Sequence, residues 1–146
     1  MERILNGRSV VPGAATGAAV VSTEPISLWG GLDPKTGRII DKRHERYGEV
    51  ITGKVFVFPQ GKGSCTASAV LLESVRLGTA PAGIINFNVD PILALGSIVA
   101  EELYEKPVPI VILSQKDHAT IRNGDCLNIK LDGTIEITAD RACKSS

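Results

Sequence analysis

Val55-Phe-Val-Phe-Pro-Gln-Gly-Lys-Gly-Ser-Cys-Thr-Ala-Ser68 is the stretch of the chain that decides the fold. It begins with β-branched and aromatic residues, which predict a buried strand, and Pro59 and Gly61 then mark a turn. Beyond the turn the apolar residues follow helical spacing. The stretch therefore predicts a strand, a glycine-rich turn and the start of a helix, in that order.

The turn in this stretch has the features of an anion-binding site. Gly61 and Gly63 permit backbone angles that turn successive amide groups toward one point, and the following helix adds the positive end of its dipole. Lys62 adds a mobile positive charge, and Ser64 and Ser68 add hydroxyl groups. We therefore predict that this loop binds an anionic ligand.

Simpler interpretations of the same residues stay open. A serine such as Ser64 at a strand-to-helix junction commonly caps the helix. A lone cysteine such as Cys65 in an apolar segment is commonly a small buried hydrophobe. A nucleotide-binding phosphate loop is excluded, because that motif needs Gly where this chain has Phe56 and Ser or Thr where it has Gly63.

Length and composition indicate one domain that spans residues 1–146. The 146 residues are 43% hydrophobic and only 4% aromatic, so they can form one core, and that core must be aliphatic. We expect the core to span about residues 7–139 and the polar tail, 140–146, to be flexible. Sixteen basic and sixteen acidic residues give a formal net charge of zero. This balance argues against nucleic acid or a membrane surface as a partner.

The sequence has no recognisable targeting or membrane-spanning segment and only three cysteines. The start has no apolar signal core, and no run reaches the roughly 20 apolar residues of a membrane span, so we expect a cytoplasmic protein. Cys65, Cys126 and Cys143 lie far apart. We expect neither a disulfide framework nor a complete zinc or iron–sulfur site from this chain alone. A metal cluster would need ligands from another chain.

Residues 23–53 form the longest segment without periodicity. Segments of this kind are often lids or binding loops, and otherwise disordered. Gly30 and Gly31, beside the only Trp, and Asp33 before Pro34 would let the segment fold over a ligand or a partner surface; a plain surface turn is an equal alternative. His44 sits among charged residues, so we expect it to be solvated.

The rest of the chain alternates between strand and helix patterns. The expected elements are strands over 9–11 and 18–21, a helix over 67–77, a strand over 82–87, a helix over 91–105 and a strand over 108–113. The alternation in the middle of the chain, from the strand at Val55 to the strand over 108–113, predicts parallel pairing with right-handed crossovers. The strands over 9–11 and 18–21 flank a turn-rich connection, which suits a compact barrel-like sheet or an ordinary hairpin. Pro109 suggests that its strand is an edge or is only beginning there.

The end of the chain has a different pattern. Turn signals at Asn123-Gly124 and Asp132-Gly133 surround two alternating segments, 126–131 and 134–138, which predict an antiparallel hairpin. The whole chain is therefore expected to have an α/β fold, with a mixed sheet or barrel and flanking helices.

Four motifs, taken in order, resemble the swivel-domain small subunit of aconitase X type dehydratases. They are Pro25-Ile-Ser-Leu-Trp-Gly-Gly-Leu-Asp-Pro-Lys-Thr-Gly37, Gly61-Lys-Gly-Ser-Cys-Thr-Ala-Ser68, Ala80-Pro-Ala-Gly-Ile-Ile85 and Asp90-Pro-Ile-Leu-Ala-Leu-Gly-Ser-Ile-Val-Ala100. The resemblance runs from about Gly7 to Leu113. It implies a swivelling β/β/α domain like the mobile domain of aconitase.

The resemblance also implies a function. A hydro-lyase of this kind would be active only with a separate large subunit, which supplies most of the substrate and metal site. Ser64 stands at the position of the family's proton acceptor. The resemblance further implies iron or an iron–sulfur cluster held mainly by the large subunit, with Cys65 as a ligand from this chain. The residues expected to contact the small hydroxy acid substrate are Gly61, Lys62, Gly63, Ser68, Gly30, Gly31 and Asp33.

Cys65 bears on the choice of substrate. The branch that resembles archaeal phosphomevalonate dehydratase generally has Thr after the serine, whereas the branch that resembles bacterial cis-3-hydroxy-L-proline dehydratase has Cys there. The resemblance therefore implies dehydration of cis-3-hydroxy-L-proline, with phosphomevalonate as the alternative. Two readings from other classes are a non-catalytic anion-binding module and a purely structural assembly domain.

Overall fold

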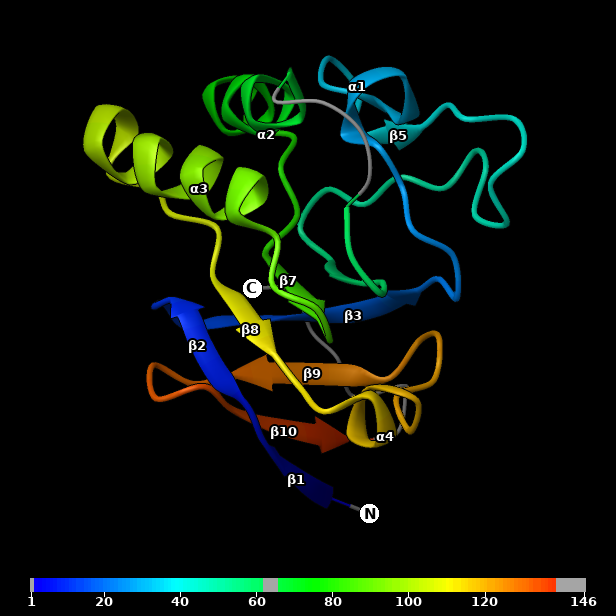
Figure 1. The fold of residues 1–146 in the computed structure, drawn as a ribbon, viewed down its shortest axis with the longest axis vertical. Helices are drawn as coiled ribbons and strands as arrows, with labels where there is room; N and C mark the ends of the chain where they lie inside the picture. Colours follow the sequence, from blue (N-terminus) through cyan, green and yellow to red (C-terminus); the bar gives the residue numbers. More distant parts are fainter. Residues whose placement is uncertain (1, 62–65, 139–146) are drawn as a thin grey trace.

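A mixed sheet that curls into a nearly closed barrel forms the centre of the protein, with helices packed on it (Figure 1). The structure is a computed structural model that describes residues 2–61 and 66–138. The strands are β1 (Glu2–Asn6), β2 (Arg8–Val11), β3 (Ala15–Val21), β4 (Leu32–Asp33), β5 (Arg38–Ile39), β6 (Val55–Val57), β7 (Gly83–Asn86), β8 (Ile110–Ile112), β9 (Cys126–Ile129) and β10 (Thr134–Thr138). The helices are α1 (Leu28–Gly31), α2 (Thr66–Leu77), α3 (Pro91–Tyr104) and α4 (Gln115–His118).

The closure of the barrel follows from one short connection. The eight-stranded sheet has the order β1-β10-β9-β3-β6-β7-β8-β2. Strands β1 and β2 are the two ends of that order, yet only Gly7 separates them along the chain, so the two edges of the sheet must meet. The Gly7 N–H donates to the Gly133 carbonyl at 3.2 Å. A side chain on Gly7 would overlap Val111 and lie 2.8 Å from the same Gly133 oxygen, so this corner requires glycine.

The sheet has a parallel half and an antiparallel half. Strands β3, β6, β7 and β8 pair in parallel. The alternation of strands and helices predicted this order for β6, β7 and β8, whereas the parallel pairing of β3 with β6 was not expected. Strands β9 and β10 form the predicted antiparallel hairpin. β8 pairs with β7 on one side and with β2 on the other, so the interpretation of this strand as an edge is wrong. Pro109 instead precedes the strand, and its carbonyl accepts the Ile84 N–H at 2.8 Å.

Strand β6 separates two apolar cores. Val55 and Val57 belong to the cluster inside the barrel, whereas Phe56 and Phe58 belong to the cluster between the sheet and the helices. Successive side chains point to opposite faces of a strand, and here both faces are covered. This explains why the opening run of the Val55 stretch is apolar throughout.

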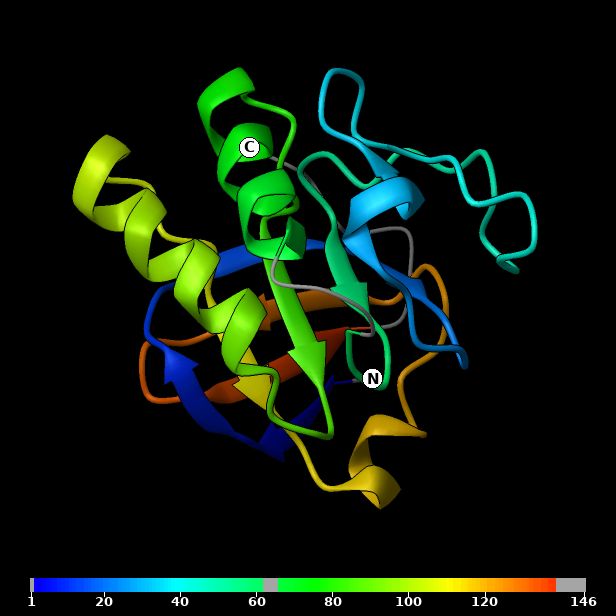
Figure 2. The same cartoon turned by 45° about the horizontal axis from the view of Figure 1, so that its top comes forward.

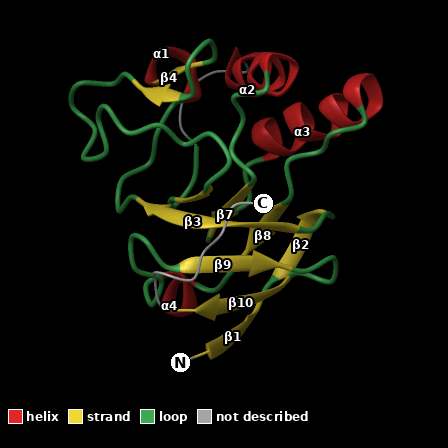
Figure 3. Ribbon diagram, turned by 180° about the vertical axis from the view of Figure 1, so that it is seen from behind, coloured by secondary structure: helices red, strands yellow, loops and turns green. Residues whose placement is uncertain are grey.

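Helices α2 and α3 pack side by side over the sheet (Figure 2). A Cβ on Gly96 of α3 would lie 2.9 Å from the Ser68 carbonyl of α2, so glycine permits this close approach. Seen from behind, the layer of α1, α2 and α3 lies on one side of the strands and the short α4 at the opposite end (Figure 3). Within the described part of the chain, no helix has the length and apolar character to cross a membrane.

The irregular segment 23–53 is packed rather than loose. It contains α1 and the small β4–β5 hairpin. Five of its aliphatic side chains are buried in the core: Ile26, Leu28, Leu32, Ile39 and Ile51. The alternative that this segment is disordered is therefore wrong, because these side chains tie it to the helix-side core.

Candidate functional site

The carboxyl ends of the parallel strands define the edge where a site is expected. Because β3, β6, β7 and β8 run in parallel, the residues that follow them meet at one edge of the sheet. Strand β6 leads through Phe58–Gly61 into the loop, and α2 begins at Thr66. The predicted Lys62, Gly63, Ser64 and Cys65 lie outside the described residues, so the structure describes the flanks of the loop.

The chain that enters this loop is held by several hydrogen bonds. The Phe58 carbonyl accepts from Asn86 Nδ2 at 2.9 Å and lies 3.0 Å from His118 Nε2. The Pro59 carbonyl accepts from the Phe87 N–H at 3.1 Å and the Asn88 N–H at 3.3 Å. The start of the loop is thus hydrogen-bonded to the last residue of β7, to the two residues that follow it and to α4.

Gly61 lies between two other elements at this edge. It pairs with Ile26 in a parallel bridge, which brings segment 23–53 beside the glycine-rich loop. A side chain at this position would overlap Asp90 Oδ2. Asp90 cannot easily yield, because its Oδ1 caps α3 by accepting the Ile92 N–H at 3.0 Å. Only glycine fits here without displacing the helix cap.

Gly30 and Gly31 line a cavity of about 400 Å³. Gly30 has a φ of +82°, a conformation that favours glycine, and its neighbour Trp29 is 61% exposed. A Cβ on Gly31 would lie 3.0 Å from Ile26 Cγ1, so this glycine also permits core packing. The structure therefore brings both glycines to one cavity, next to the segment that pairs with Gly61.

Asp33 and Ser68 occupy other positions. Asp33 Oδ1 accepts the Lys35 N–H at 2.9 Å and stabilises the turn after β4, and Asp33 is not among the residues that line the cavity. The backbone of Ser68 faces Gly96 at the contact between α2 and α3. A substrate contact by either residue remains a prediction.

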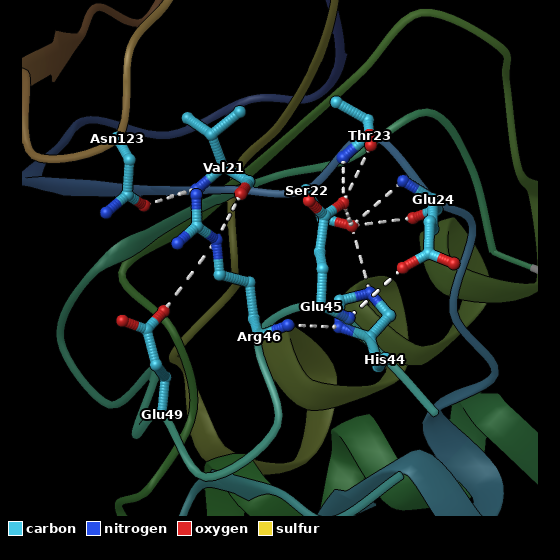
Figure 4. Close-up of polar contacts among 9 residues, drawn as sticks. All are labelled: Val21, Ser22, Thr23, Glu24, His44, Glu45, Arg46, Glu49 and Asn123. Carbon is cyan, nitrogen blue, oxygen red and sulfur yellow. Dashed lines mark hydrogen bonds and ion pairs between the residues drawn. The ribbon is translucent and has the colours of Figure 1, made fainter. Parts of the chain in front are cut away.

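Two residues that line the cavity, Glu24 and His44, belong to a cluster of polar contacts (Figure 4). The Arg46 N–H donates to His44 Nδ1 at 3.1 Å, so the neutral His44 ring carries its proton on Nε2 and donates to Ser22 Oγ at 2.9 Å. The Glu24 N–H also donates to Ser22 Oγ, at 3.0 Å. His44 is only 5% exposed, so the expectation that it is solvated is wrong. A turn closed by the His44 N–H on the Asp41 carbonyl directs the ring inward despite its charged neighbours.

Glu45 and Arg46 fasten the same cluster to the end of β3. The Thr23 hydroxyl donates to Glu45 Oε1 at 2.8 Å, and Arg46 Nε donates to the Val21 carbonyl at 2.6 Å. Partial burial opposes ionisation of Glu45, but hydrogen bonds from Thr23 and Ser22 outweigh it and lower the pKa of the carboxyl. These hydrogen bonds therefore hold Glu45 and Arg46, and with them the cavity-lining His44, against the end of β3.

His118 is the second buried histidine. Its ring meets Phe87 edge-on, with centroids 5.0 Å apart and an interplanar angle of 90°. Burial disfavours the charged imidazolium and lowers the pKa of His118 below its ordinary value, although hydrogen bonds to backbone carbonyls partly offset this effect. The neutral ring can donate to the Phe58 carbonyl only when Nε2 carries the proton.

The lowered pKa makes His118 a source of acid sensitivity. Below the ordinary histidine pKa of 6.5, the unfolded chain binds a proton that the folded chain resists, so the free energy of unfolding should fall as pH decreases. Gln does not titrate, and we expect His118→Gln to reduce this fall. Urea unfolding at about pH 7.5 and about pH 5.5 measures the difference. Equal losses in both proteins would contradict the assignment.

The described residues do not form a complete metal site. Among residues 2–61 and 66–138, no group of three or more His, Cys, Asp or Glu side chains is placed to hold a metal ion. The predicted ligand Cys65 lies outside the described residues.

Sequence reasoning did not identify Asn86 or His118 as residues of this edge. Asn86 did have a signal, because it is a polar residue at the end of a predicted buried strand, where ligand sites of parallel sheets occur. His118 had none, since α4 has only four residues and no periodicity.

The fold and the loop together define an α/β domain with a candidate ligand site at the carboxyl edge of its parallel strands. The family model described as the aconitase X swivel domain matches residues 4–137. The chain therefore belongs to the aconitase X swivel-domain family, which confirms the resemblance of the four motifs.

Two relatives differ in how much of their own length this chain covers. The chain is 37% identical over 142 residues to the phosphomevalonate dehydratase small subunit of Methanosarcina acetivorans, covering 96% of this chain and 94% of that protein. It is 43% identical over 109 residues to the cis-3-hydroxy-L-proline dehydratase of Pseudomonas aeruginosa, covering 75% of this chain but 19% of that protein. This chain thus spans nearly all of a small subunit and about a fifth of a longer enzyme.

A solved structure supports the fold. The chain superposes on aconitase X of Thermococcus kodakaraensis, a crystal structure of the holo-form, with a TM-score of 0.84. The sequences are 33% identical, and the match covers 93% of this chain and 98% of that chain. The predicted fold, a mixed barrel-like sheet with flanking helices, is confirmed.

Proposed function

We propose that this chain is the small subunit of an aconitase X type hydro-lyase that dehydrates a small hydroxy acid after binding a large subunit. The observation that carries the proposal is the glycine-rich loop at the carboxyl edge of β6, in a chain of this family. Relatives of nearly the same length are named dehydratase small subunits, which supports a large subunit as the partner.

In this proposal Ser64 accepts a proton from the carbon next to the substrate carboxylate. An alcohol cannot do this at its ordinary pKa, so its alkoxide must be stabilised. Lys62, the Gly63 N–H and the positive end of α2 supply that stabilisation. The electron pair of the broken C–H bond forms a double bond as the neighbouring hydroxyl departs. The hydroxyl leaves as hydroxide and takes up a proton, and Ser64 gives up the proton that it accepted, so the net products are an unsaturated acid and water.

The other predicted site residues take supporting roles. Gly61 and Ser68 would contact the substrate from the loop side, and Gly30 and Gly31 from the cavity that they line. Asp33 would act by holding the turn that follows β4. These two groups of residues can face one ligand because Ile26 pairs with Gly61.

Cys65 is proposed to donate one thiolate to iron or an iron–sulfur cluster whose other ligands come from the large subunit. A cysteine just before a helix N-terminus has a lowered pKa, which favours the thiolate that iron binds. A bound cluster of this kind supplies Lewis acidity to a reaction.

Two substrates are candidates. Cys65 supports cis-3-hydroxy-L-proline, because the branch of the family that resembles the hydroxyproline enzymes has Cys at this position. Phosphomevalonate is the second candidate, because the relative matched over 94% of its own length is a phosphomevalonate dehydratase small subunit. The two substrates differ in charge and shape, so an assay separates them.

Reconstitution with the large subunit tests the function. We expect the complex, assembled under anaerobic conditions and analysed for iron and sulfide, to turn over cis-3-hydroxy-L-proline, and each subunit alone to be inactive. Turnover of phosphomevalonate alone would reassign the substrate. A metal-loaded complex that converted neither compound would exclude the hydro-lyase, and tight anion binding by the isolated chain would then support the anion-binding module.

A further inference from the structure

Asn86 and His118 meet at the point where the chain leaves the sheet for the loop. Phe58 is the first residue after β6, and its carbonyl is shared between Asn86 Nδ2 and His118 Nε2. Both side chains are buried: Asn86 is 0% exposed at the end of β7, and His118 is 6% exposed at the end of α4. Side chains from two distant segments therefore replace the strand partner that this carbonyl lacks.

Few main-chain groups determine the direction in which the chain leaves β6. The Phe58 N–H still donates to the Ile85 carbonyl at 3.1 Å, but Pro59 has no N–H to donate. The two carbonyls are therefore the remaining main-chain groups through which Phe58 and Pro59 can be held. Asn86 and His118 hold the first of them, and backbone amides after β7 hold the second.

We propose that Asn86 and His118 are positioning residues that fix the path by which the chain leaves β6 at Phe58 and Pro59, and that proton transfer by the proposed base Ser64 depends on this path. The inference rests on the proposed role of Ser64. Proton transfer requires close alignment of donor and acceptor, and a misplacement of about 1 Å can cost about 100-fold in rate. Loss of either hydrogen bond should therefore lower kcat more than it raises KM.

A substitution of Asn86 can distinguish an effect on positioning from an effect on the stability of the fold. Its Oδ1 is buried and has no hydrogen-bond partner among the described residues, which costs free energy in the folded state. Leu has a similar size, removes this unpaired oxygen and also removes the Nδ2 donor. We expect Asn86→Leu to leave the midpoint of urea unfolding close to that of the wild type while lowering kcat.

His118 permits a matched pair of substitutions. His118→Phe keeps a ring to pack against Phe87 but removes the N–H that reaches the Phe58 carbonyl. His118→Gln loses the ring but keeps an N–H donor near the position of Nε2. The Gln variant should therefore retain more activity than the Phe variant, although Phe is the better mimic of shape.

Ser97 on α3 offers a control at the opposite edge of the sheet. Its Oγ donates to the Val108 carbonyl at 2.6 Å and accepts the Val108 N–H at 2.7 Å, just before β8 begins. Like Asn86, it is a buried side chain hydrogen-bonded to a main-chain group that lies just outside a strand. Ser97→Ala should destabilise the fold without changing the kcat of the folded complex.

The test uses the complete chain with its large subunit. We expect Asn86→Leu and His118→Phe to lower kcat about tenfold or more with KM within about twofold, and His118→Gln to recover part of the loss. Wild-type kcat in both Asn86→Leu and His118→Phe would overturn the inference. An equal loss of kcat in Ser97→Ala would also overturn it, because a general loss of stability would then explain the effect.

A second measurement does not depend on activity. The Phe87 and Asn88 amides donate to the Pro59 carbonyl, so their hydrogen exchange reports on the position of this segment. Exchange should accelerate in Asn86→Leu and His118→Phe but not in Ser97→Ala. Unchanged exchange in the first two variants would overturn the positioning role. An inactive wild-type complex combined with accelerated exchange would instead count against the proposed function of Ser64 alone.

Discussion

Replacing Ser64 with Ala should lower kcat of the reconstituted complex by about 100-fold to 10,000-fold, the usual contribution of a positioned acid–base group. The alcohol would be lost while the loop backbone and Lys62 remain, so substrate binding should change little. Steady-state kinetics with the preferred substrate, together with the affinity of the variant for the large subunit, measure the effect. Full activity of Ser64→Ala would remove this serine from the mechanism.

Ser64→Asn is the matched control for the alternative that Ser64 only caps α2. Asn is a good N-cap residue, whereas Ala costs about 1 kcal/mol at a capped position. Asn cannot accept the proton as an alkoxide does, so Ser64→Asn should be as inactive as Ser64→Ala but more stable. Recovery of activity in Ser64→Asn would identify the serine as a cap.

Leu71→Ala should lower the free energy of unfolding by about 2–5 kcal/mol, the range for a buried leucine that leaves a cavity. Leu71 is 0% exposed on the inner face of α2, within the core shared with Phe56 and Phe58. Urea unfolding of the isolated chain at neutral pH measures the loss. Because α2 follows the loop directly, this variant should also be inactive at temperatures where the wild-type complex works.

Leu77→Ala is the control for this prediction, because Leu77 lies on the same helix and is 39% exposed. Its truncation leaves no closed cavity, so the loss should be within about 0.5–1 kcal/mol. Similar losses for both variants would mean that α2 is held by something other than the core beneath it.

Elements with strong periodicity were predictable from the sequence. The helix expected over 67–77 is α2, and the helix capped by Asp90 is α3. The parallel order of β6, β7 and β8 followed from the alternation of strands and helices. In each case the apolar spacing extends over enough residues to determine both the type of element and the face that it buries.

Short elements were not predictable for the opposite reason. Strand β1 was not expected, because its pairing with β10 is decided by a segment more than a hundred residues away in the chain. The β4–β5 hairpin has only two residues in each strand, too few for an alternation to show. Local sequence carries little information where contacts between distant segments supply the stability.

The candidate site likewise has one part that the sequence predicted and another that only the structure revealed. The glycine-rich loop and its hydroxyls were visible as a run of adjacent residues, whereas the groups that hold the loop come from β7 and α4. His44 shows the limit most clearly. Its charged neighbours predicted exposure, yet a turn buries the ring against Ser22.

The sequence by itself determined β6, the two crossover helices α2 and α3 and the family, because each depends on residues close together in the chain. Only the tertiary structure decided that the barrel closes at Gly7, that Ile26 lies against Gly61, and that Asn86 and His118 share one carbonyl. The physical reason is that periodicity and turn chemistry act between near neighbours, whereas closure and buried hydrogen bonds depend on how distant segments meet once the apolar faces have packed.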